Sequence, residues 1–502
     1  MSAKLSYDSS EINWMKNVIK EDEITKYMVN GKDFIDEEEI WKKLEENRNP
    51  EPQKIRDILQ KSLAVETLEP AETAALLNVE DEGLWEEMFD VSARIKKKVY
   101  DNRIVTFAPL YLSNYCVNNC LYCSFRRENS VQKRRKLTLE EVKDETLALA
   151  GKIGHKRLIA VYGEHPASDA NYIADTIRSI YDVKVKTQNG YGQIRRVNVN
   201  ASPMSVPDLE MLREVGIGTY QVFQETYHHE TYRQVHPAGT LKSNYRWRLY
   251  ALHRAIEAGV DDVAIGVLFG LYDWRFEVMG LLRHAIDMER QFDGIGPHTI
   301  SFPRLEPAAN TPFTHESKYK VSDRDFKRLV SVIRLSVPYT GMIITARERA
   351  EIKRDIIPVG CTQTDASTRI GIGAYSDRYV KQEAERQQFI LGDTRSLDEI
   401  IRELAEMGHI TSFCTAGYRC GRTGTHIMSL LRCGQEGRFC KLNAVLTFRE
   451  WLDDFASEET KKAGEKIIKK ELGEIKEEMP SAYTQLTEYY KRIEDGERDL
   501  YF

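Results

Sequence analysis

Three cysteines in one short stretch are the strongest chemical signal in this sequence. The stretch "CVNNCLYC" holds Cys116, Cys120 and Cys123. Three thiolates on one tight loop can bind three irons of a [4Fe–4S] cluster, and the fourth iron is then open to a ligand that is not part of the protein. Zinc is the alternative, but its structural sites usually need four protein ligands. No fourth cysteine or histidine lies nearby in the sequence.

The elements that must position these cysteines alternate between β-rich runs and amphipathic helices, from about residue 100 onward. Helical patterns such as "TLEEVKDETLALAGKIG" separate the runs. The repeated order predicts an α/β fold with a parallel sheet, and eight units favour a (β/α)8 barrel of the TIM type over an open doubly wound sheet. The eight candidate strands are "RIVTFAPLYL", "RLIAVYG", "RRVNVN", "TYQVFQ", "DDVAIGVLFG", "HTISFP", "GMIIT" and "CTQTDA".

Three zones divide the chain. Residues 1–85 are charged, with apolar residues at three- and four-residue spacing, and they predict an N-terminal helical extension. We expect the barrel over residues 86–385, with the cysteine loop directly after its first strand, at the end where barrel enzymes place their active sites. Residues 386–502 predict a mainly helical C-terminal domain that ends in charged, solvated helices.

Bulk composition excludes several classes of protein. The net charge of -6 over 502 residues offers no basic field for nucleic acid. The start "MSAKLSYDSSEINW" has no apolar core of a signal peptide, and no run of about 18 apolar residues predicts a membrane helix. We therefore expect a cytoplasmic protein. Seven of the eight cysteines fall in two local groups, which in a reducing compartment indicates metal binding or redox chemistry.

The C-x3-C-x2-C spacing, with Tyr122 before its last cysteine, resembles the signature of the radical S-adenosylmethionine (SAM) superfamily. The resemblance implies a [4Fe–4S] cluster and SAM as cofactors, with Tyr122 beside them. "VYGE" at the end of the second strand is similar to the superfamily's glycine–glycine–glutamate motif, although Tyr162 replaces the first glycine. Gly163 and Glu164 are then implied to contact SAM, with Glu164 accepting a hydrogen bond from its amino group.

Further polar residues end the third and fourth predicted strands, where they should face the mouth of the barrel. Each residue alone is as consistent with simple hydrogen bonding, but the set favours a ligand site. We expect SAM contacts from three of them and a catalytic role for the fourth. They are Asn198, Asn200 and Gln224 for SAM, and Glu225 for catalysis.

Longer segments, including "FQETYH", "GLYD" and "PHTIS", resemble the aromatic amino-acid lyases of the superfamily. These include the tyrosine lyases of thiazole synthesis (ThiH) and the [FeFe]-hydrogenase maturases (HydG), and the maturases are the more similar, over residues 85–455. The resemblance implies cleavage of the Cα–Cβ bond of tyrosine to p-cresol and dehydroglycine. Arg347 in "ITARERA" matches the family's "STRE" segment and is our candidate for the substrate carboxylate, which a guanidinium holds by two charge-assisted bonds.

Other readings stay open. The same fold could act on another aromatic amino acid such as tryptophan, or release a different downstream product, as a ThiH-like lyase without carbon monoxide and cyanide synthesis does. A different class would be an iron–sulfur electron carrier or a zinc-binding module. For the lyase, the resemblance implies a small-molecule substrate, a reductant protein such as ferredoxin or flavodoxin, and a monomer or homodimer.

A second cysteine group lies in the C-terminal zone. The maturases carry an additional cluster there, on a C-x2-C-x22-C motif. Cys414 and Cys440 match its first and last positions, but Gly417 stands at the middle one. Cys420 or Cys433 could supply a third thiolate; otherwise the remaining cysteines are free thiols. We interpret the missing ligand as loss or change of this second cluster.

His298 completes the candidate residues. In the maturases the second cluster makes carbon monoxide and cyanide from dehydroglycine, and its extra iron has a histidine ligand. His298 opens the sixth predicted strand, in "GPHTIS", and could fill that role. A purely structural role for a histidine at the start of a strand is an equal alternative.

Overall fold

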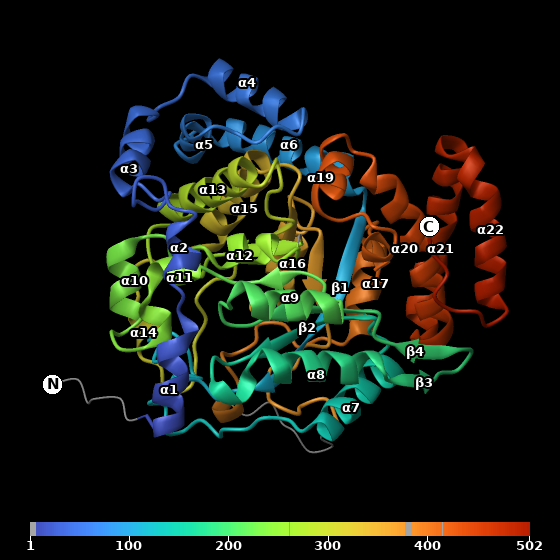
Figure 1. Cartoon of the computed structure of the whole chain (residues 1–502). Coiled ribbons are helices and arrows are strands. Elements are labelled where there is room, and N and C mark those ends of the chain that lie inside the picture. Colours follow the sequence, from blue (N-terminus) through green and yellow to red (C-terminus); the bar gives the residue numbers. More distant parts are fainter. Residues whose placement is uncertain (1–6, 261, 377–383, 414) are drawn as a thin grey trace.

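A closed barrel of eight parallel strands forms the centre of the molecule (Figure 1). The computed structural model describes residues 7–260, 262–376, 384–413 and 415–502. Strand β1 pairs with β2 on one side and with β10 on the other, which closes the sheet and confirms the predicted (β/α)8 barrel. The barrel strands are β1 (Arg103–Ser113), β2 (Arg157–Tyr162), β5 (Arg196–Asn200), β6 (Tyr220–Gln221), β7 (Val263–Gly266), β8 (Thr299–Ser301), β9 (Gly341–Ile344) and β10 (Gln363–Asp365).

Helices follow the strands and surround the barrel. Serine, threonine or aspartate side chains cap the first turns of six of them, where backbone N–H groups otherwise lack partners. The capping residues are Thr138, Asp169, Ser205, Asp273, Ser322 and Ser396. The helices are α7 (Leu139–Leu147), continued by η1 (Ala148–Ile153), η2 (Pro166–Ser168), α8 (Ala170–Tyr181), α9 (Val206–Val215), α10 (His229–Val235), η3 (Leu241–Ser243), α11 (Tyr245–Leu249), α12 (Ala251–Glu257), α13 (Trp274–Gln291), α14 (Phe313–Glu316), α15 (Asp323–Ser336), α16 (Ala350–Ile356), η4 (Ala384–Arg386) and α17 (Leu397–Glu406).

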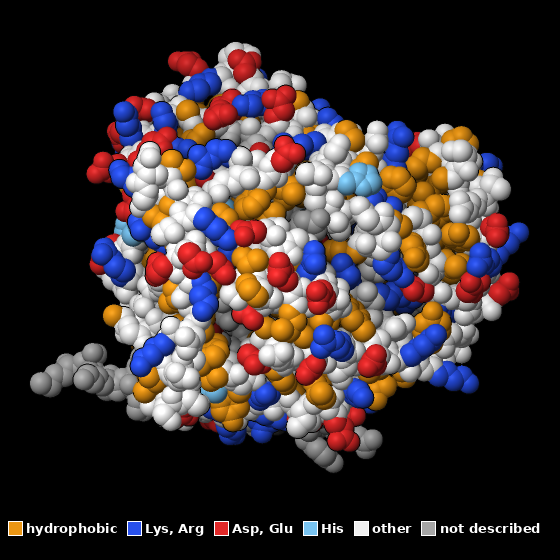
Figure 2. Space-filling model, viewed as in Figure 1, with side chains coloured by type: hydrophobic (Ala, Val, Ile, Leu, Met, Phe, Trp, Pro, Cys, Tyr) orange, Lys and Arg blue, Asp and Glu red, His pale blue; other side chains and the backbone are white. Residues whose placement is uncertain are grey.

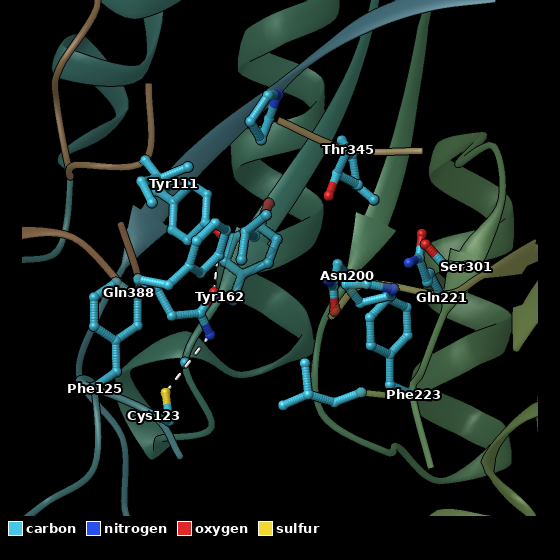
Figure 3. Close-up of a pocket in the computed structure, with 18 of the residues that line it drawn as sticks. Tyr111, Cys123, Phe125, Tyr162, Asn200, Gln221, Phe223, Ser301, Thr345 and Gln388 are labelled. Carbon is cyan, nitrogen blue, oxygen red and sulfur yellow. Dashed lines mark hydrogen bonds between the residues drawn. The ribbon is translucent and has the colours of Figure 1, made fainter. Parts of the chain in front are cut away.

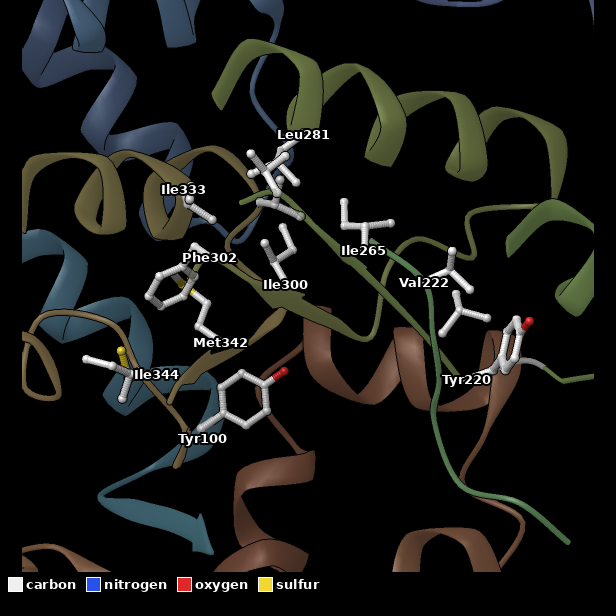
Figure 4. Packing of buried hydrophobic residues seen from close by; sticks show 14 of the residues in the cluster. Tyr100, Tyr220, Val222, Ile265, Leu281, Ile300, Phe302, Ile333, Met342 and Ile344 are labelled. Carbon is white, nitrogen blue, oxygen red and sulfur yellow. The ribbon is translucent and has the colours of Figure 1, made fainter. Parts of the chain in front are cut away.

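The main core lies between the strands and these helices. Successive strand side chains point to opposite faces, so Ile300 and Met342 turn outward while Ser301 turns into the barrel. Figure 4 shows the outward layer: strand residues such as Ile265 and Ile300 meet Leu281 of α13 and Ile333 of α15. This packing fixes the strands, and through them the loops at their carboxyl ends.

The N-terminal zone is helical, as predicted. Helices α3 to α6 pack on α13 and α15, whereas α1 and α2 run down one side of the barrel (Figure 1). The last of these helices, α6, connects directly to the barrel, because β1 starts three residues after α6 ends. The six helices are α1 (Ser9–Val18), α2 (Asp22–Thr25), α3 (Glu37–Glu46), α4 (Pro52–Leu63), α5 (Pro70–Leu77) and α6 (Glu82–Tyr100).

The C-terminal zone begins as part of the barrel. Helix α17 is the eighth barrel helix, and β11 (Ile410–Ser412) pairs in parallel with the start of β1, so the C-terminal zone continues the barrel sheet. Buried Glu450 joins the later helices to the barrel, since it accepts from Lys156 at 3.0 Å and Arg195 at 2.7 Å. The later elements are α18 (Ala416–Arg419), α19 (Gly424–Arg432), α20 (Glu436–Phe455), α21 (Glu458–Glu478) and α22 (Pro480–Glu494).

A separate hairpin is formed by β3 (Lys184–Lys186) and β4 (Tyr191–Gln193).

The surface carries charges of both signs. On the face in Figure 2, acidic and basic side chains intermingle, most densely over the N-terminal helices at the upper left. None of the helices that the structure describes combines the length and the apolar character needed to cross a bilayer.

Candidate active site

The cysteine loop lies at the carboxyl ends of β1 and β2. The backbone N–H of Val117 donates to the carbonyl of Glu164 at 2.8 Å, which joins the loop to the end of β2. Cys120 is buried, and Cys116 and Cys123 are half-buried. Burial raises the pKa of Cys120 to about 12 despite the nearby Lys242. Bound metal would supply the positive charge that a thiolate needs at such a site.

All three thiols line one cavity in the mouth of the barrel. It contains about 1480 Å³ of empty space, its open mouth included. Figure 3 shows Tyr111, Phe125, Tyr162 and Gln388 on one side and Asn200, Gln221, Phe223 and Ser301 on the other.

The number of thiols favours a cluster over a single zinc ion. Three thiolates can bind three different irons of a [4Fe–4S] cluster, whereas a structural zinc ion usually has four protein ligands.

The N-terminal helix clamps the outer side of the cysteine loop. Buried Glu11 of α1 pairs with Arg127 at 2.7 and 2.8 Å and contacts His165 Nε2 at 3.1 Å. Tyr7 Oη donates to the carbonyl of Val117 at 2.9 Å, and the Arg127 guanidinium lies 4.4 Å from the Tyr7 ring centroid. A segment more than 100 residues earlier in the sequence therefore holds the loop and the end of β2 together.

The "VYGE" segment lies against this loop. An added Cβ at Gly163 would lie 2.2 Å from the carbonyl oxygen of Tyr115, so only glycine fits there. Asn118 donates to Glu164 and accepts from the Lys242 N–H at 2.8 Å. Burial raises the pKa of Glu164, although Arg248 and Asn118 oppose the shift.

Tyr122 is fixed by a buried histidine. Its Oη lies 2.7 Å from His236 Nε2, while Nδ1 of that ring lies 2.9 Å from the carbonyl of Tyr232. A carbonyl only accepts, so Nδ1 carries the proton and Nε2 accepts from the phenol. Burial holds the pKa of His236 well below its ordinary value, which keeps the ring neutral. The Tyr122 ring therefore has one orientation beside the cysteines.

Glu225 forms a buried charge cluster with two basic residues. Its Oε1 accepts from Lys242 at 2.6 Å and lies 3.4 Å from Arg248 Nη2. Burial alone would raise the pKa of Glu225, but Lys242 and Arg248 outweigh it and lower the pKa. Its backbone has φ 73°, a left-handed conformation that costs a non-glycine residue free energy.

Glu277 of α13 holds that strained segment from behind. It accepts from Thr226 Oγ1 and, at 2.9 Å, from the Tyr227 N–H, the two residues after Glu225. Full burial raises the pKa of Glu277 to about 8, and the two hydrogen bonds only partly oppose the shift. The carboxyl group therefore stabilises the conformation that points Glu225 into the cavity.

Arg347 enters the cavity from the loop after β9. Its guanidinium lies 3.4 Å from the ring centroid of Phe389. Glu348, the next residue, is paired with Arg304, which anchors the loop. Arg347 itself has no hydrogen-bond or ion-pair partner among the described residues, so its fork is available to a ligand.

Two predicted SAM residues do not line the cavity. Asn198 lies two residues nearer the base of β5 than Asn200, and its Oδ1 accepts from the Thr219 N–H at 3.0 Å. Gln224 is buried and turns to the opposite face of its strand from the cavity-lining Phe223 and Glu225. In both positions the structure differs from our expectation. The other predicted residues of this site do line it: Cys116, Cys120, Tyr122, Cys123, Gly163, Glu164, Asn200, Glu225 and Arg347.

Several lining residues escaped the sequence analysis. Period-two alternation from Glu225 back along its strand points to Phe223 and Gln221, and the same rule on β8 points to Ser301. Lys242, Arg248 and Gln388 follow no such pattern, because they come from helices and loops that reach the cavity only in the folded chain.

The described cysteines of the second group, Cys420, Cys433 and Cys440, lie at the other end of the barrel (Figure 1). Cys414 is outside the described residues. Cys440 is buried, with its Sγ 3.5 Å from Glu436 Oε1, whereas Cys420 and Cys433 are exposed. His298 lies at the base of β8, its Nδ1 4.0 Å from Asp262 Oδ2. Tyr418, next to Gly417, donates to that same carboxylate.

Comparisons with known proteins identify similar families and solved structures. The model of the Radical SAM superfamily matches residues 110–281, and that of the Biotin and Thiamin Synthesis associated domain matches residues 301–410. The crystal structure of HydG, a maturase of the [FeFe]-hydrogenase, is 47% identical, covers 94% of this chain and 100% of its own, and has a TM-score of 0.88.

Two more relatives extend this similarity. The X-ray structure of the maturase HydG from Carboxydothermus hydrogenoformans is 38% identical over 94% of this chain and 99% of its own, with a TM-score of 0.74. The 2-iminoacetate synthase of Escherichia coli (strain K12) is 26% identical over 70% of this chain and 88% of its own length.

The pKa of Glu277 predicts a pH dependence of stability. Since this pKa is about 8 in the folded protein and 4.5 for an ordinary glutamate, folding takes up a proton between these pH values. The stabilising contribution is complete below pH 4.5 and is lost as pH rises towards 8. In Glu277→Gln, which is neutral at every pH, the fall of the thermal unfolding midpoint from pH 5 to pH 8 should be smaller. Exposed Glu316→Gln is the control, and parallel curves for all three proteins would contradict the prediction.

Proposed function

The chain belongs to the HydG family of radical SAM proteins, and we propose from this membership that it cleaves tyrosine between Cα and Cβ, to p-cresol and dehydroglycine. The observation that supports the proposal most is that Cys116, Cys120, Cys123 and Arg347 line one cavity. A site for radical generation and a site for an amino-acid carboxylate are thereby within one enclosed space.

The cofactors follow from the family: a [4Fe–4S] cluster and SAM. We assign the cluster to the three cysteines, whose positions fit it. A reduced cluster held by Cys116, Cys120 and Cys123 would supply the electron for reductive cleavage of SAM. Glu164 is positioned to accept from the SAM amino group, and its bond from Asn118 fixes the carboxylate beside the cysteine loop.

Arg347 orients the substrate by binding its carboxylate. A guanidinium binds a carboxylate by two parallel charge-assisted bonds, which fix direction as well as position. Phe389 supports one face of this guanidinium. Below it, Phe107, Ile159 and Ile343 form an apolar cluster inside the barrel, which excludes water from the reacting atoms. The reaction removes a hydrogen from the tyrosine amino group, and the phenolic fragment takes up one electron and one proton to become p-cresol.

The electron needs a reductant, as in other radical SAM enzymes. We propose a ferredoxin or flavodoxin as the donor. The structure describes one chain, and we propose that the protein acts as a monomer or homodimer.

We further propose that this chain does not carry the second cluster. Gly417 offers no thiol, and a Cβ there would meet only Arg422 O at 3.6 Å and Arg422 Cβ at 4.0 Å, so the backbone does not require glycine. Cys420 Sγ contacts the carbonyl of Phe502 at 3.6 Å, and Cys433 Sγ that of Leu430 at 3.5 Å. Both thiols are exposed rather than directed into the base of the barrel beside His298. Dehydroglycine is then the released product.

Anaerobic turnover tests the lyase. The reconstituted protein with SAM, tyrosine and dithionite should form p-cresol and 5′-deoxyadenosine. Cys116→Ala, Cys120→Ala and Cys123→Ala should form neither, since each removes one of three cluster ligands. Cys361→Ala, which removes a buried cysteine away from the cavity, is the control and should retain both products. Formation of 5′-deoxyadenosine by a cluster-cysteine variant would overturn the assignment.

The role of Arg347 predicts that charge alone is not sufficient. Arg347→Ala should weaken tyrosine binding by about tenfold or more, and Arg347→Lys should weaken it almost as much, because an ammonium cannot form the two-pronged contact. Tyrosine dissociation constants, measured anaerobically with SAM present, check this. Exposed Arg349→Lys on the same loop should bind normally. Unchanged affinity in both Arg347 variants would place the carboxylate elsewhere.

Restoring the missing thiol tests the loss of the second cluster. The unmodified protein should hold about four irons per chain and form little carbon monoxide. Gly417→Cys should raise the iron content by about four, because it completes a set of three thiolates. Gly473→Cys adds a thiol on α21, where nothing lies within 4 Å of the new Cβ, and should add no iron. About eight irons in the unmodified protein would contradict the proposal, and Cys420→Ala and Cys433→Ala would then identify the substitute ligand.

A further inference from the structure

Residues 387–393, which we call the strap, run between the cysteine loop and the loop of Arg347. At one end, the carbonyl of Gln388 accepts from Ser124 N–H at 3.4 Å and from Ser124 Oγ at 3.0 Å. At the other end, the N–H groups of Gly392 and Asp393 donate to the carbonyl of Ala346 at 2.8 and 3.0 Å. The strap is thus tied at both ends.

The strap packs closely on the Arg347 loop. A Cβ at Gly392 would lie 2.4 Å from the carbonyl oxygen of Arg347, so a larger residue would force the two segments apart. Phe389 lies directly under the guanidinium. Gln388, between this contact and the Ser124 contact, therefore has little freedom to move.

The side chain of Gln388 reaches the last cysteine of the loop. Its Nε2 donates to Cys123 Sγ at 3.6 Å, and its Oε1 accepts from Tyr111 Oη at 3.0 Å (Figure 3). With the amide turned over, its oxygen would face the sulfur, and two acceptors would repel. The sulfur of Cys123 thus selects the orientation in which the N–H faces it, and Tyr111, buried on β1, supports that orientation by donating to the amide oxygen.

A second side-chain amide, that of Asn118, also lies beside a cysteine, but it divides its hydrogen bonds between sulfur and a carboxylate. Asn118 Nδ2 lies 3.8 Å from Cys116 Sγ, and the same nitrogen also donates to Glu164. Gln388 Nε2 has Cys123 as its only hydrogen-bond acceptor among the described residues. Hydrogen bonds to the sulfurs of an iron–sulfur cluster are among the determinants of its reduction potential, since they stabilise the more negative, reduced form.

We propose that Gln388 is a positioning residue whose N–H···S bond to Cys123 raises the reduction potential of the cluster, with Tyr111 holding the amide in the donating orientation. The inference rests on the proposed function in that Cys123 is a cluster ligand. The strap, a segment outside the cysteine motif, then determines how readily the cluster accepts the electron that starts the reaction.

A redox titration tests this. Gln388→Met keeps the length of the side chain but cannot donate. The midpoint potential of its reconstituted cluster, followed by electron paramagnetic resonance without tyrosine, should be more negative than that of the unmodified protein. The equilibrium constant for reduction should fall about fivefold, as expected for one neutral hydrogen bond. Tyr111→Phe should shift the potential in the same direction but less, because the amide loses only its orienting partner.

Ile390→Ser is the matched control, since the side chain of Ile390 is 48% exposed on the same strap. It should leave the potential unchanged. A Gln388→Met protein with about four irons and an unshifted potential would overturn the inference. If this variant fails to retain iron, an unshifted potential in Tyr111→Phe overturns it equally. Absence of iron from the unmodified protein would instead contradict the proposed function.

Discussion

The parallel pairing of β1 with β10 is the constraint on which the site depends. Val105 lies opposite Gln363 in this pair, and β1 pairs with β2 on its other side. The loops after β1, β2, β9 and β10 are therefore neighbours at one rim of the barrel. Those loops contain the three cysteines, Glu164, Arg347 and the strap. An open sheet would separate the first strand from the last, and with them the cysteines from Arg347.

Buried charge is the second organising feature of the mouth. Glu225 is ionised beside Lys242 and Arg248, whereas burial raises the pKa of Glu277 and the nearby carboxylates of Asp273 and Glu37 raise it further. The difference follows from surroundings alone, since both are fully enclosed carboxyl groups. One carboxylate presents charge to the cavity, and the other stabilises the backbone that presents it.

The two ends of the barrel differ in their sets of thiols. At the mouth, each thiol lies in one cavity, and amide groups approach two of them. At the base, Asp262, Tyr418 and His298 form a polar cluster, but the position between Cys414 and Cys440 that would add a thiol is Gly417. The space around Gly417 is open to a side chain, so the difference from the maturase motif is chemical rather than steric.

The sequence by itself determined the elements and the chemistry that depend on local pattern. Seven of the eight barrel strands fall within the predicted runs, and β1 extends one residue beyond its run, to Ser113. The cysteine spacing, Glu164 and Arg347 were candidates from the sequence alone, because strand periodicity and motif spacing are properties of neighbouring residues. The alternation of side chains also explains why Gln224 was wrongly expected to face the cavity. Its neighbours Phe223 and Glu225 line the cavity, so Gln224 points to the opposite face. Asn198 is on the same face of β5 as the cavity-lining Asn200, but it lies two residues nearer the base of the barrel and does not reach the cavity.

Only the tertiary structure decided which distant side chains support this chemistry. Gln388 is 265 residues from Cys123, and Glu11 is 116 residues from Arg127. Lys242 and Arg248 reach Glu225 from a helical segment with no motif of its own. Contacts of this kind leave no local periodicity, since they arise from how the closed barrel brings its loops together and how α1 folds back over them. The candidate cluster ligands can therefore be predicted from the sequence, whereas the side chains that contact them from distant segments are visible only in the fold.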